Sequence, residues 1–154
     1  MKIALIQSSL FWEKPKENRN HFEEKINGIT NEVDLIVLPE MFTSGFTMNP
    51  NAVAETMQGE TIAWLKHLAK AKYAAITGSL VITENGNFYN RLVFVFPSGE
   101  IQFYDKRHLF TLAGEDEIYT AGSKKIIVEY KGWKICPLIC YDLRFPVFSR
   151  NVEN

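Results

Sequence analysis

The dipeptide Asn85-Gly86 constrains the fold more than any other short feature of the sequence, because it lies between two long apolar runs. The runs span residues 74–83 and 88–96. Asn-Gly readily adopts the positive φ angles of a two-residue turn whose twist matches that of paired strands. We therefore predict two long antiparallel strands that are joined at this turn.

The chain before this hairpin alternates between strand and helix patterns. Residues 3–7 predict a first strand, and residues 34–38 are a continuous apolar run that ends at a proline, which is typical of a strand covered on both faces. Apolar residues at helical spacing predict one helix that starts near Asn18 and ends before Thr30. The same periodicity predicts a second helix over residues 59–72.

Further strands follow the hairpin, over residues 101–104, 125–130 and 133–139, and the last two flank the turn Lys131-Gly132. The order of strand, helix, strand, helix and then hairpins predicts a mixed α/β sheet with helices on at least one face. With 154 residues and no internal repeat or linker, the chain is expected to form one domain.

Composition excludes several classes of protein. Apolar residues make up 46% and charged residues 23%, which is ordinary for a globular domain and argues against disorder. A net charge of −1 lacks the strong field of proteins that bind nucleic acid or anionic membranes. No apolar stretch approaches the ~20 residues of a membrane span, and the apolar start is too short for a signal peptide. The expected location is the cytoplasm.

The two cysteines, Cys136 and Cys140, are expected to be free thiols. On one extended strand their Cα atoms would lie about 13 Å apart at ~3.3 Å per residue, whereas a disulfide needs less than ~7 Å. Free thiols suit a reducing compartment. Too few Cys and His residues lie at short spacing for a zinc site, so no metal is expected. We expect Cys136 to be a core residue.

Three chemically useful residues come just after predicted strands: Glu40, Lys106 and Cys140. Ligands of α/β sheets bind beyond strand ends. A carboxylate, an ammonium and a thiol supply a base, an oxyanion stabiliser and a nucleophile, which are the groups that acyl transfer requires. Each also has a purely structural explanation. Glu40 could be an acid near a helix start, Lys106 a charge on a solvated loop, and Cys140 an inert core residue.

The segments around these residues resemble the signature segments of the nitrilase superfamily of carbon–nitrogen hydrolases. They are "LPEMF" (38–42), "YDKRHLF" (104–110) and "ICYDLRFP" (139–146), in the family's order. "PEMFTSGF" (39–46) and "LAGEDEIYTAG" (112–122) look most like the ω-amidase branch. The resemblance implies a four-layer α-β-β-α sandwich and hydrolysis of the ω-amide of 2-oxoglutaramate or a related dicarboxylate monoamide.

The resemblance also implies roles for individual residues. Cys140 would be the nucleophile, Glu40 the general base and acid, and Lys106 the stabiliser of the tetrahedral intermediate. Glu115 would orient the others, although the two acidic residues that follow it offer alternative registers. Tyr141 would donate its backbone N–H to the oxyanion. Water would complete the reaction through a thioester, with no metal or organic cofactor.

The substrate pocket is less defined by the sequence. A substrate with a free carboxylate needs a cation, for which Arg144 and Arg107 are candidates, while either could equally form a surface ion pair. Another amide, a nitrile or a carbamoyl amine would use the same thioester route. A non-catalytic assembly domain, with Trp133 and residues 88–96 as an apolar interface, is a further alternative.

The family's domain is longer than 154 residues, so residues 1–154 are expected to be its N-terminal, incomplete portion. We expect this portion alone to have little or no activity, because a site loosened by 1 Å loses on the order of a hundredfold in rate. The full-length protein is expected to be a homo-oligomer that acts on a small-molecule amide and binds neither nucleic acid nor membrane.

Overall fold

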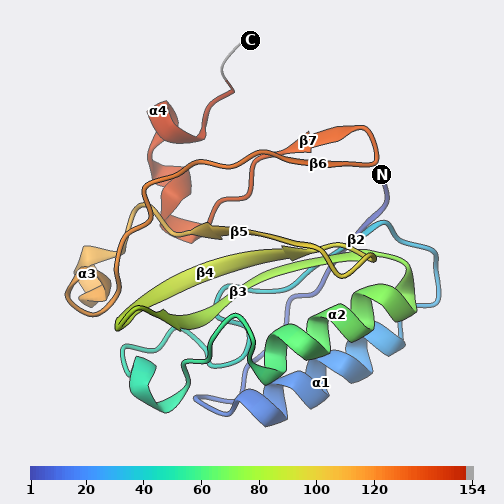
Figure 1. Cartoon of the computed structure of the whole chain (residues 1–154), viewed down its shortest axis with the longest axis horizontal. Helices are drawn as coiled ribbons and strands as arrows, with labels where there is room; N and C mark the ends of the chain where they lie inside the picture. The colour runs from blue at the N-terminus through green and yellow to red at the C-terminus, as the bar shows by residue number, and fades with distance from the viewer. Residues whose placement is uncertain (152–154) are drawn as a thin grey trace.

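A five-stranded mixed sheet lies at the centre of the computed structural model, which describes residues 1–151 (Figure 1). Its strands, in spatial order, are β1 (Ile3–Leu5), β2 (Leu35–Val37), β3 (Ala75–Glu84), β4 (Asn87–Val95) and β5 (Ile101–Asp105). The first three are parallel, and β4 is antiparallel to both β3 and β5. Because β5 is thus parallel to β2 and β3, the carboxyl ends of these strands meet at one edge of the sheet.

The predicted hairpin is confirmed, and its turn explains its register. Asn85 and Gly86 have φ angles of 51° and 78°, and Glu84 pairs directly with Asn87. Both central residues are therefore left-handed, as a type I′ turn requires. In the next strand pair Arg91 lies opposite Asp105. This register decides which side chains of β4 and β5 face each side of the sheet.

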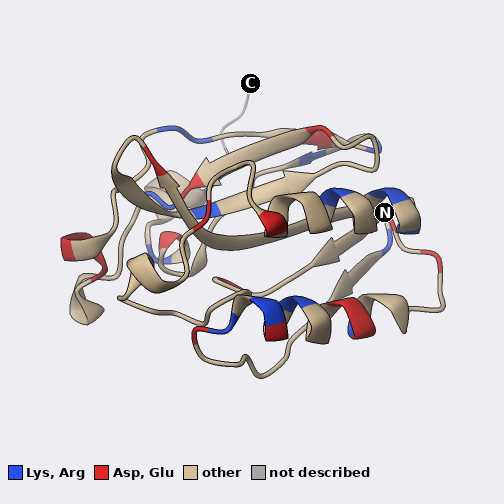
Figure 2. Cartoon of the chain, turned by 60° about the horizontal axis from the view of Figure 1, so that its bottom comes forward, with Lys and Arg blue, Asp and Glu red and all other residues tan. Residues whose placement is uncertain are grey.

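Two helices cover one face of the sheet, α1 (Pro15–Asn27) and α2 (Glu60–Lys72) (Figure 1). Their buried side chains, such as Phe22 and Leu65, form the main core together with sheet residues that include Ile76 and Val93. The first helix begins three residues before the predicted start, because Pro15 occupies the first turn, where a missing N–H costs nothing. Both helices carry charged residues of both signs (Figure 2).

A second, two-stranded sheet packs on the opposite face and consists of β6 (Val128–Tyr130) and β7 (Trp133–Ile135) (Figure 1). Val128 contacts the central sheet in a small core with Leu35, Ala75 and Phe94. The remaining short elements are η1 (Pro50–Ala52), η2 (Thr111–Ala113), α3 (Glu115–Ile118), η3 (Cys140–Arg144) and α4 (Pro146–Ser149). The mixed α/β class predicted from the sequence is confirmed.

The predicted strands over residues 125–130 and 133–139 are too long. The second ends at Ile135, and the four residues before Cys140 have no regular structure. Pro137 explains the early end, because it has no N–H to donate to a ladder. Cys140 therefore opens the short helix η3 and does not sit at a strand exit. Cys136 is only half-buried, so its placement in the core is wrong, while both cysteines are free as predicted.

Within residues 1–151, none of the helices has the length and hydropathy needed to span a bilayer.

Candidate active site

The candidate site lies at the sheet edge where the carboxyl ends of β2 and β5 meet. Glu40 follows β2 by three residues, and Lys106 directly follows β5. The backbone N–H of Lys106 donates to the carbonyl of Asn90 at 3.0 Å, which continues the β4–β5 ladder by one step. The parallel direction of β2 and β5 therefore brings together two residues that are 66 positions apart.

Lys106 is buried among acidic partners, so its interpretation as a charge on a solvated loop is wrong. Its side chain is 0% exposed, and its Nζ lies 2.8 Å from Glu40 Oε1 and 2.9 Å from Glu115 Oε2. Burial alone would lower the pKa of Lys106, but the hydrogen bonds and charges of the two glutamates outweigh it and raise that pKa. The ammonium is therefore a fixed positive charge.

Glu115 is the acidic residue of its segment that reaches Lys106. It is fully buried, whereas Asp116 and Glu117 are exposed. Its Oε2 also accepts a hydrogen bond from the backbone N–H of Phe110 at 2.6 Å. The turn of α3 and the preceding loop thus fix this carboxylate from both sides.

Asn90 joins the same cluster, and the sequence analysis did not single it out. Its Nδ2 donates to Glu40 Oε1 at 2.8 Å and to Glu115 Oε1 at 3.1 Å. Both amide hydrogens are thereby used on carboxylates, which settles the orientation of the amide. A signal existed in the sequence, because the polar Asn90 shares one face of its strand with the apolar residues Phe88 and Leu92.

Glu40 is the member of this cluster that reaches open space. Its side chain is 23% exposed, while Lys106, Glu115 and Asn90 are fully buried. The backbone after it is held by Ser79, whose Oγ accepts a hydrogen bond from the N–H of residue 41 at 2.9 Å. One end of the Glu40 carboxylate is therefore anchored, and the side chain lines a cavity.

Cys140 lines that same cavity, which has a volume of about 130 Å³ and mostly apolar walls that include Leu92 and Leu138. The cysteine is accessible and has a positive φ of 43°. Partial burial raises the pKa of the Cys140 thiol, the charge of Glu40 raises it further, and Lys106 opposes both. The thiol is therefore protonated at neutral pH and needs a base before it can act as a nucleophile.

The comparison with protein families now adds to this geometry. A family model described as carbon-nitrogen hydrolase matches residues 2–153. The chain belongs to the carbon–nitrogen hydrolase family.

Relatives of this carbon–nitrogen hydrolase chain include amidases. It is 46% identical over 154 residues to the omega-amidase YafV of Escherichia coli K12, covering 100% of this chain and 59% of that protein. It is 34% identical over 151 residues to the 2-oxoglutaramate amidase of Bacillus subtilis, covering 96% of this chain and 58% of that protein. The chain thus spans less than two thirds of the curated relatives it matches.

A solved structure confirms the hydrolase fold. XC1258 from Xanthomonas campestris, a CN-hydrolase superfamily protein with an arsenic adduct in its active site, superposes with a TM-score of 0.95 at 44% identity. The match covers 98% of this chain and 57% of that one. An amidase from Nesterenkonia sp. AN1 shares the fold at 20% identity, with a TM-score of 0.82 over 96% of this chain and 60% of that one.

The other predicted site residues of this carbon–nitrogen hydrolase chain make no side-chain hydrogen bond or ion pair with Glu40, Lys106 or Glu115 within residues 1–151. Tyr141 directly follows Cys140, and its ring contacts Phe110 edge-on at 5.1 Å. Arg144 is exposed and does not line the cavity shared by Glu40 and Cys140. Arg107 is also exposed, and its guanidinium donates to the carbonyl of Gly122 at 3.2 Å. In the described part of the chain, no group of three or more His, Cys, Asp or Glu side chains is arranged to hold a metal.

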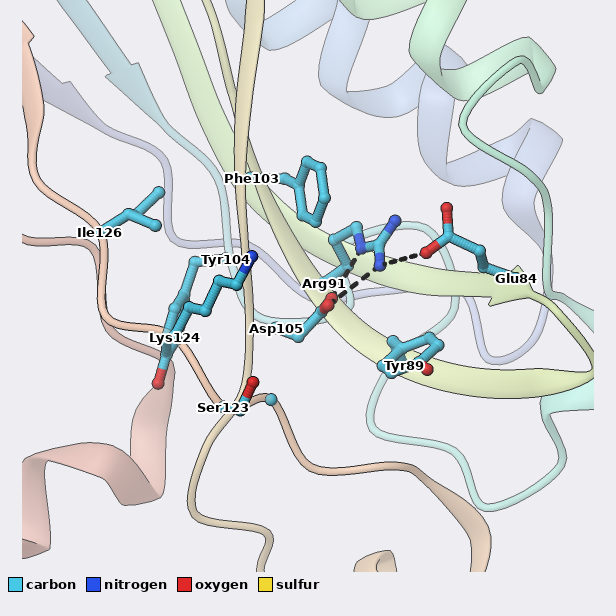
Figure 3. A pocket seen from close by; sticks show the side chains of 10 residues that line it. Glu84, Tyr89, Arg91, Phe103, Tyr104, Asp105, Ser123, Lys124 and Ile126 are labelled. Atoms are coloured by element: carbon cyan, nitrogen blue, oxygen red, sulfur yellow. Dashed lines mark hydrogen bonds and ion pairs between the residues drawn. The ribbon is translucent and has the colours of Figure 1, made fainter.

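A second hollow of about 250 Å³ lies beside the outer strand β5 and contains no thiol (Figure 3). Its main feature is Arg91, which is buried and ion-paired with Asp105 and Glu84. The guanidinium lies 4.0 Å from the ring centroid of Phe103, and its remaining nitrogen is covered and has no hydrogen-bond partner among residues 1–151. Because Asp105 and Glu84 already balance the charge of Arg91, we assign this arginine a structural role.

Proposed function

We propose that this chain carries the catalytic residues of an amidase that hydrolyses a linear carbon–nitrogen amide through a thioester on Cys140. The observation that carries the proposal is the placement of Glu40. Its carboxylate is held by Lys106 and Asn90 on one side, and it lines a cavity with Cys140 on the other. A base fixed beside a protonated thiol is the arrangement that nucleophilic catalysis by cysteine needs.

In the first step, Glu40 accepts the Cys140 proton as the sulfur attacks the amide carbonyl, and a negative charge forms on the carbonyl oxygen. The backbone N–H of Tyr141 is a candidate donor to this oxygen. One well-placed donor is worth roughly 3 kcal/mol, or about a hundredfold in rate. Because the Lys106 side chain is covered, its charge acts on the oxyanion from behind Glu40 and without direct contact.

The second step transfers the proton from Glu40 to the amide nitrogen, so the carbon–nitrogen bond breaks and ammonia leaves. The acyl group remains on Cys140 as a thioester. Glu40 then takes a proton from water, which attacks the thioester and releases the carboxylic acid, and the proton returns to the sulfur. Lys106, Asn90 and Glu115 keep the carboxylate in place through both proton transfers.

The favoured substrate is the ω-amide of 2-oxoglutaramate or a related dicarboxylate monoamide. Its support is the similarity to the omega-amidase of E. coli and the 2-oxoglutaramate amidase of B. subtilis. Residues 1–154 are proposed to form the N-terminal portion of a hydrolase domain, since the relatives extend further. Residues beyond this portion would complete the pocket and any oligomer interface.

The test follows both ammonia release and covalent chemistry. The chain is incubated with 2-oxoglutaramate, simple aliphatic amides, a nitrile and a carbamoyl amine, and then quenched for mass spectrometry of the cysteine peptides. We expect an acyl adduct on Cys140 from the ω-amide, absent in Cys140→Ala and retained in Cys136→Ala. Ammonia release that survives Cys140→Ala would exclude this nucleophile.

The rate of the same reaction tests the expectation about the portion alone. We expect ammonia release far below the roughly 10 s⁻¹ of a typical enzyme. An ordinary rate would show that residues 1–154 already hold the site in its productive geometry. A nitrile or a carbamoyl amine as the best substrate would move the assignment to another branch of the family.

A further inference from the structure

Asp142 is a buried carboxylate close to Cys140 for which the proposed mechanism has no use. The residue is 0% exposed. Its Oδ2 accepts hydrogen bonds from Tyr104 Oη at 2.7 Å and from the Ile139 N–H at 3.0 Å. Its Oδ1 contacts both the backbone N–H of His108 at 2.9 Å and the His108 Nδ1 at 2.8 Å. Each oxygen therefore has two partners, which is an unusually complete set for one side chain.

The partners of Asp142 come from the two segments that carry Lys106 and Cys140. Tyr104 lies in β5 two residues before Lys106, and His108 lies two residues after it. Ile139 directly precedes Cys140. One carboxylate thus connects the chain on both sides of the lysine with the chain on both sides of the cysteine.

The same carboxylate closes the turn that holds Cys140 in its left-handed conformation. The Ile139 N–H donates to the Asp142 side chain, and the Asp142 N–H donates to the Ile139 carbonyl at 3.0 Å. A non-glycine residue in this region is strained and persists where its surroundings fix it. The two reciprocal hydrogen bonds around Cys140, whose φ is 43°, supply that constraint.

The outer side of this connection is closed by aromatic packing. The His108 ring stacks on Phe145 with the ring centroids 3.7 Å apart and the planes 10° from parallel. Phe148 contacts the same imidazole edge-on at 5.0 Å. His108 is therefore held between η3, α4 and the Asp142 carboxylate, which leaves the two segments little freedom to separate.

We propose that Asp142 is a positioning residue that ties the Cys140 turn to the Lys106 segment and so sets the cysteine sulfur against the Glu40 carboxylate. The catalytic roles of Cys140 and Glu40 rest on the proposed function, whereas the contacts of Asp142 do not. Asparagine at this position would keep one acceptor oxygen but turn an NH₂ group toward a backbone N–H, either that of His108 or that of Ile139. The Asp142→Asn substitution therefore breaks the connection on one side without changing its size.

The experiment measures how strongly Glu40 influences the Cys140 thiol. Alkylation of the chain by iodoacetamide is followed over pH by peptide mass spectrometry, with Cys136 as an internal reference. In the wild-type background, Glu40→Gln removes a charge that raises the Cys140 pKa, so the alkylation midpoint should move to lower pH. In the Asp142→Asn background we expect Glu40→Gln to produce less than about half of that shift.

If Asp142 only stabilised the fold, Asp142→Asn would leave the effect of Glu40→Gln on the Cys140 alkylation midpoint unchanged in a protein that remains folded. Asp34→Asn is the matched control, because Asp34 is also hydrogen-bonded but precedes β2, at the opposite end of that strand from Glu40. An undiminished shift in folded Asp142→Asn would overturn the proposal. If that variant does not fold, Tyr104→Phe keeps the carboxylate but removes the hydrogen bond from the Tyr104 hydroxyl to Asp142, together with the one that this hydroxyl accepts from the Arg107 N–H. An undiminished shift there would equally overturn the proposal. Because alkylation requires no turnover, either outcome is independent of whether the chain is an amidase.

Discussion

Two buried cations, Arg91 in β4 and Lys106 at the end of β5, each lie between two carboxylates, yet they have different roles. Arg91 adjoins Asn90 in β4, and Asp105 adjoins Lys106 at the end of β5. Since neighbouring residues of a strand face opposite sides, one cluster lies on each side of the same strand pair. Because the two cations carry the same charge, a difference in role between the clusters must come from their surroundings.

The arginine cluster is made within one piece of sheet. Asp105 lies directly opposite Arg91 and accepts two hydrogen bonds from it, at 2.6 and 2.9 Å, and Glu84 accepts one at 3.0 Å from the end of the hairpin. Burial would lower the pKa of Arg91, but these partners outweigh it and raise it. The planar, bidentate pair fixes strand alignment, and no cysteine is among the described residues that line the hollow beside it.

The lysine cluster is made from segments that are distant along the chain. Glu40 is 66 residues from Lys106, and Glu115 comes from a separate short helix. Its distinguishing feature is that Glu40 extends from the buried group into the cavity of Cys140. The comparison indicates that a buried cation with two carboxylates can serve catalysis when one of the carboxylates is also accessible to a reactive group, as Glu40 is to Cys140.

The largest expected effect in this comparison is that of Lys106→Met. The substitution leaves Glu40 and Glu115 close together without their cation, and breaking a buried pair in this way costs about 3–5 kcal/mol of unfolding free energy. Urea unfolding measures it, and Lys66→Met on the exposed side of α2 is the control, expected to change stability by less than about 0.5 kcal/mol. If Lys106→Met lowers the unfolding free energy as little as the control does, the charge of Lys106 does not hold the cluster together.

Arg91→Met should cost less, about 2 kcal/mol, because its partners can be rehydrated. The Glu84 side chain is 46% exposed and that of Asp105 is 16% exposed, whereas Glu115 is fully buried. The same urea titration serves, combined with thiol alkylation, which should leave the relative reactivity of Cys140 and Cys136 unchanged. If Arg91→Met is the more destabilising substitution, the contrast between the clusters is reversed.

Asn90→Ala removes two hydrogen bonds to carboxylates and should cost about 1.5 kcal/mol. The control lies in the same strand, since the side chain of exposed Asn87 makes a single long contact of 3.4 Å within its own turn. Asn87→Ala should therefore be close to neutral. Equal unfolding free energies for the two variants would show that Asn90 does not support the glutamates.

The smallest effect concerns pH. Because the pKa of the Cys140 thiol is raised in the folded chain, the unfolded chain loses this proton first as pH rises above about 8.5. Stability is therefore complete below that pH and is lost as pH rises through the folded pKa. Cys140→Ser should show a shallower fall in urea stability between about pH 8 and 10. Parallel curves for the two proteins would contradict the raised pKa.

The sequence was informative where short-range rules decide the structure. The turn at Asn85-Gly86 and the two helices follow from local patterns, and the positions of Glu40 and Lys106 after strands follow from the strand order. Burial of Lys106 could not be read from its charged neighbours, because one of its two glutamate partners lies 66 residues away and the other is in a separate short helix. A lysine side chain is expected to be exposed to solvent unless an ion-pair partner is known.

Other features were missed although the sequence contained a signal. Pro137 argued against a strand that continued to Ile139, and the polar Asn90 stood out on an apolar strand face. Asp142 belongs to the segment that carried the family resemblance, yet nothing local shows that Tyr104 and His108 are its partners. Such contacts depend on how β5 and η3 meet, which is a property of the folded chain.

The pairing of Arg91 with Asp105 has a consequence for how the molecule assembles. If β5 slid along β4 by one position, Asp105 and Lys106 would exchange sides. Arg91 would then lose its partner Asp105 while Lys106 would turn away from Glu40 and Glu115. A misaligned chain would therefore lose stability at the arginine cluster and the geometry of the lysine cluster together. A sequence that preserves the lysine cluster thus also preserves the alignment of β4 and β5.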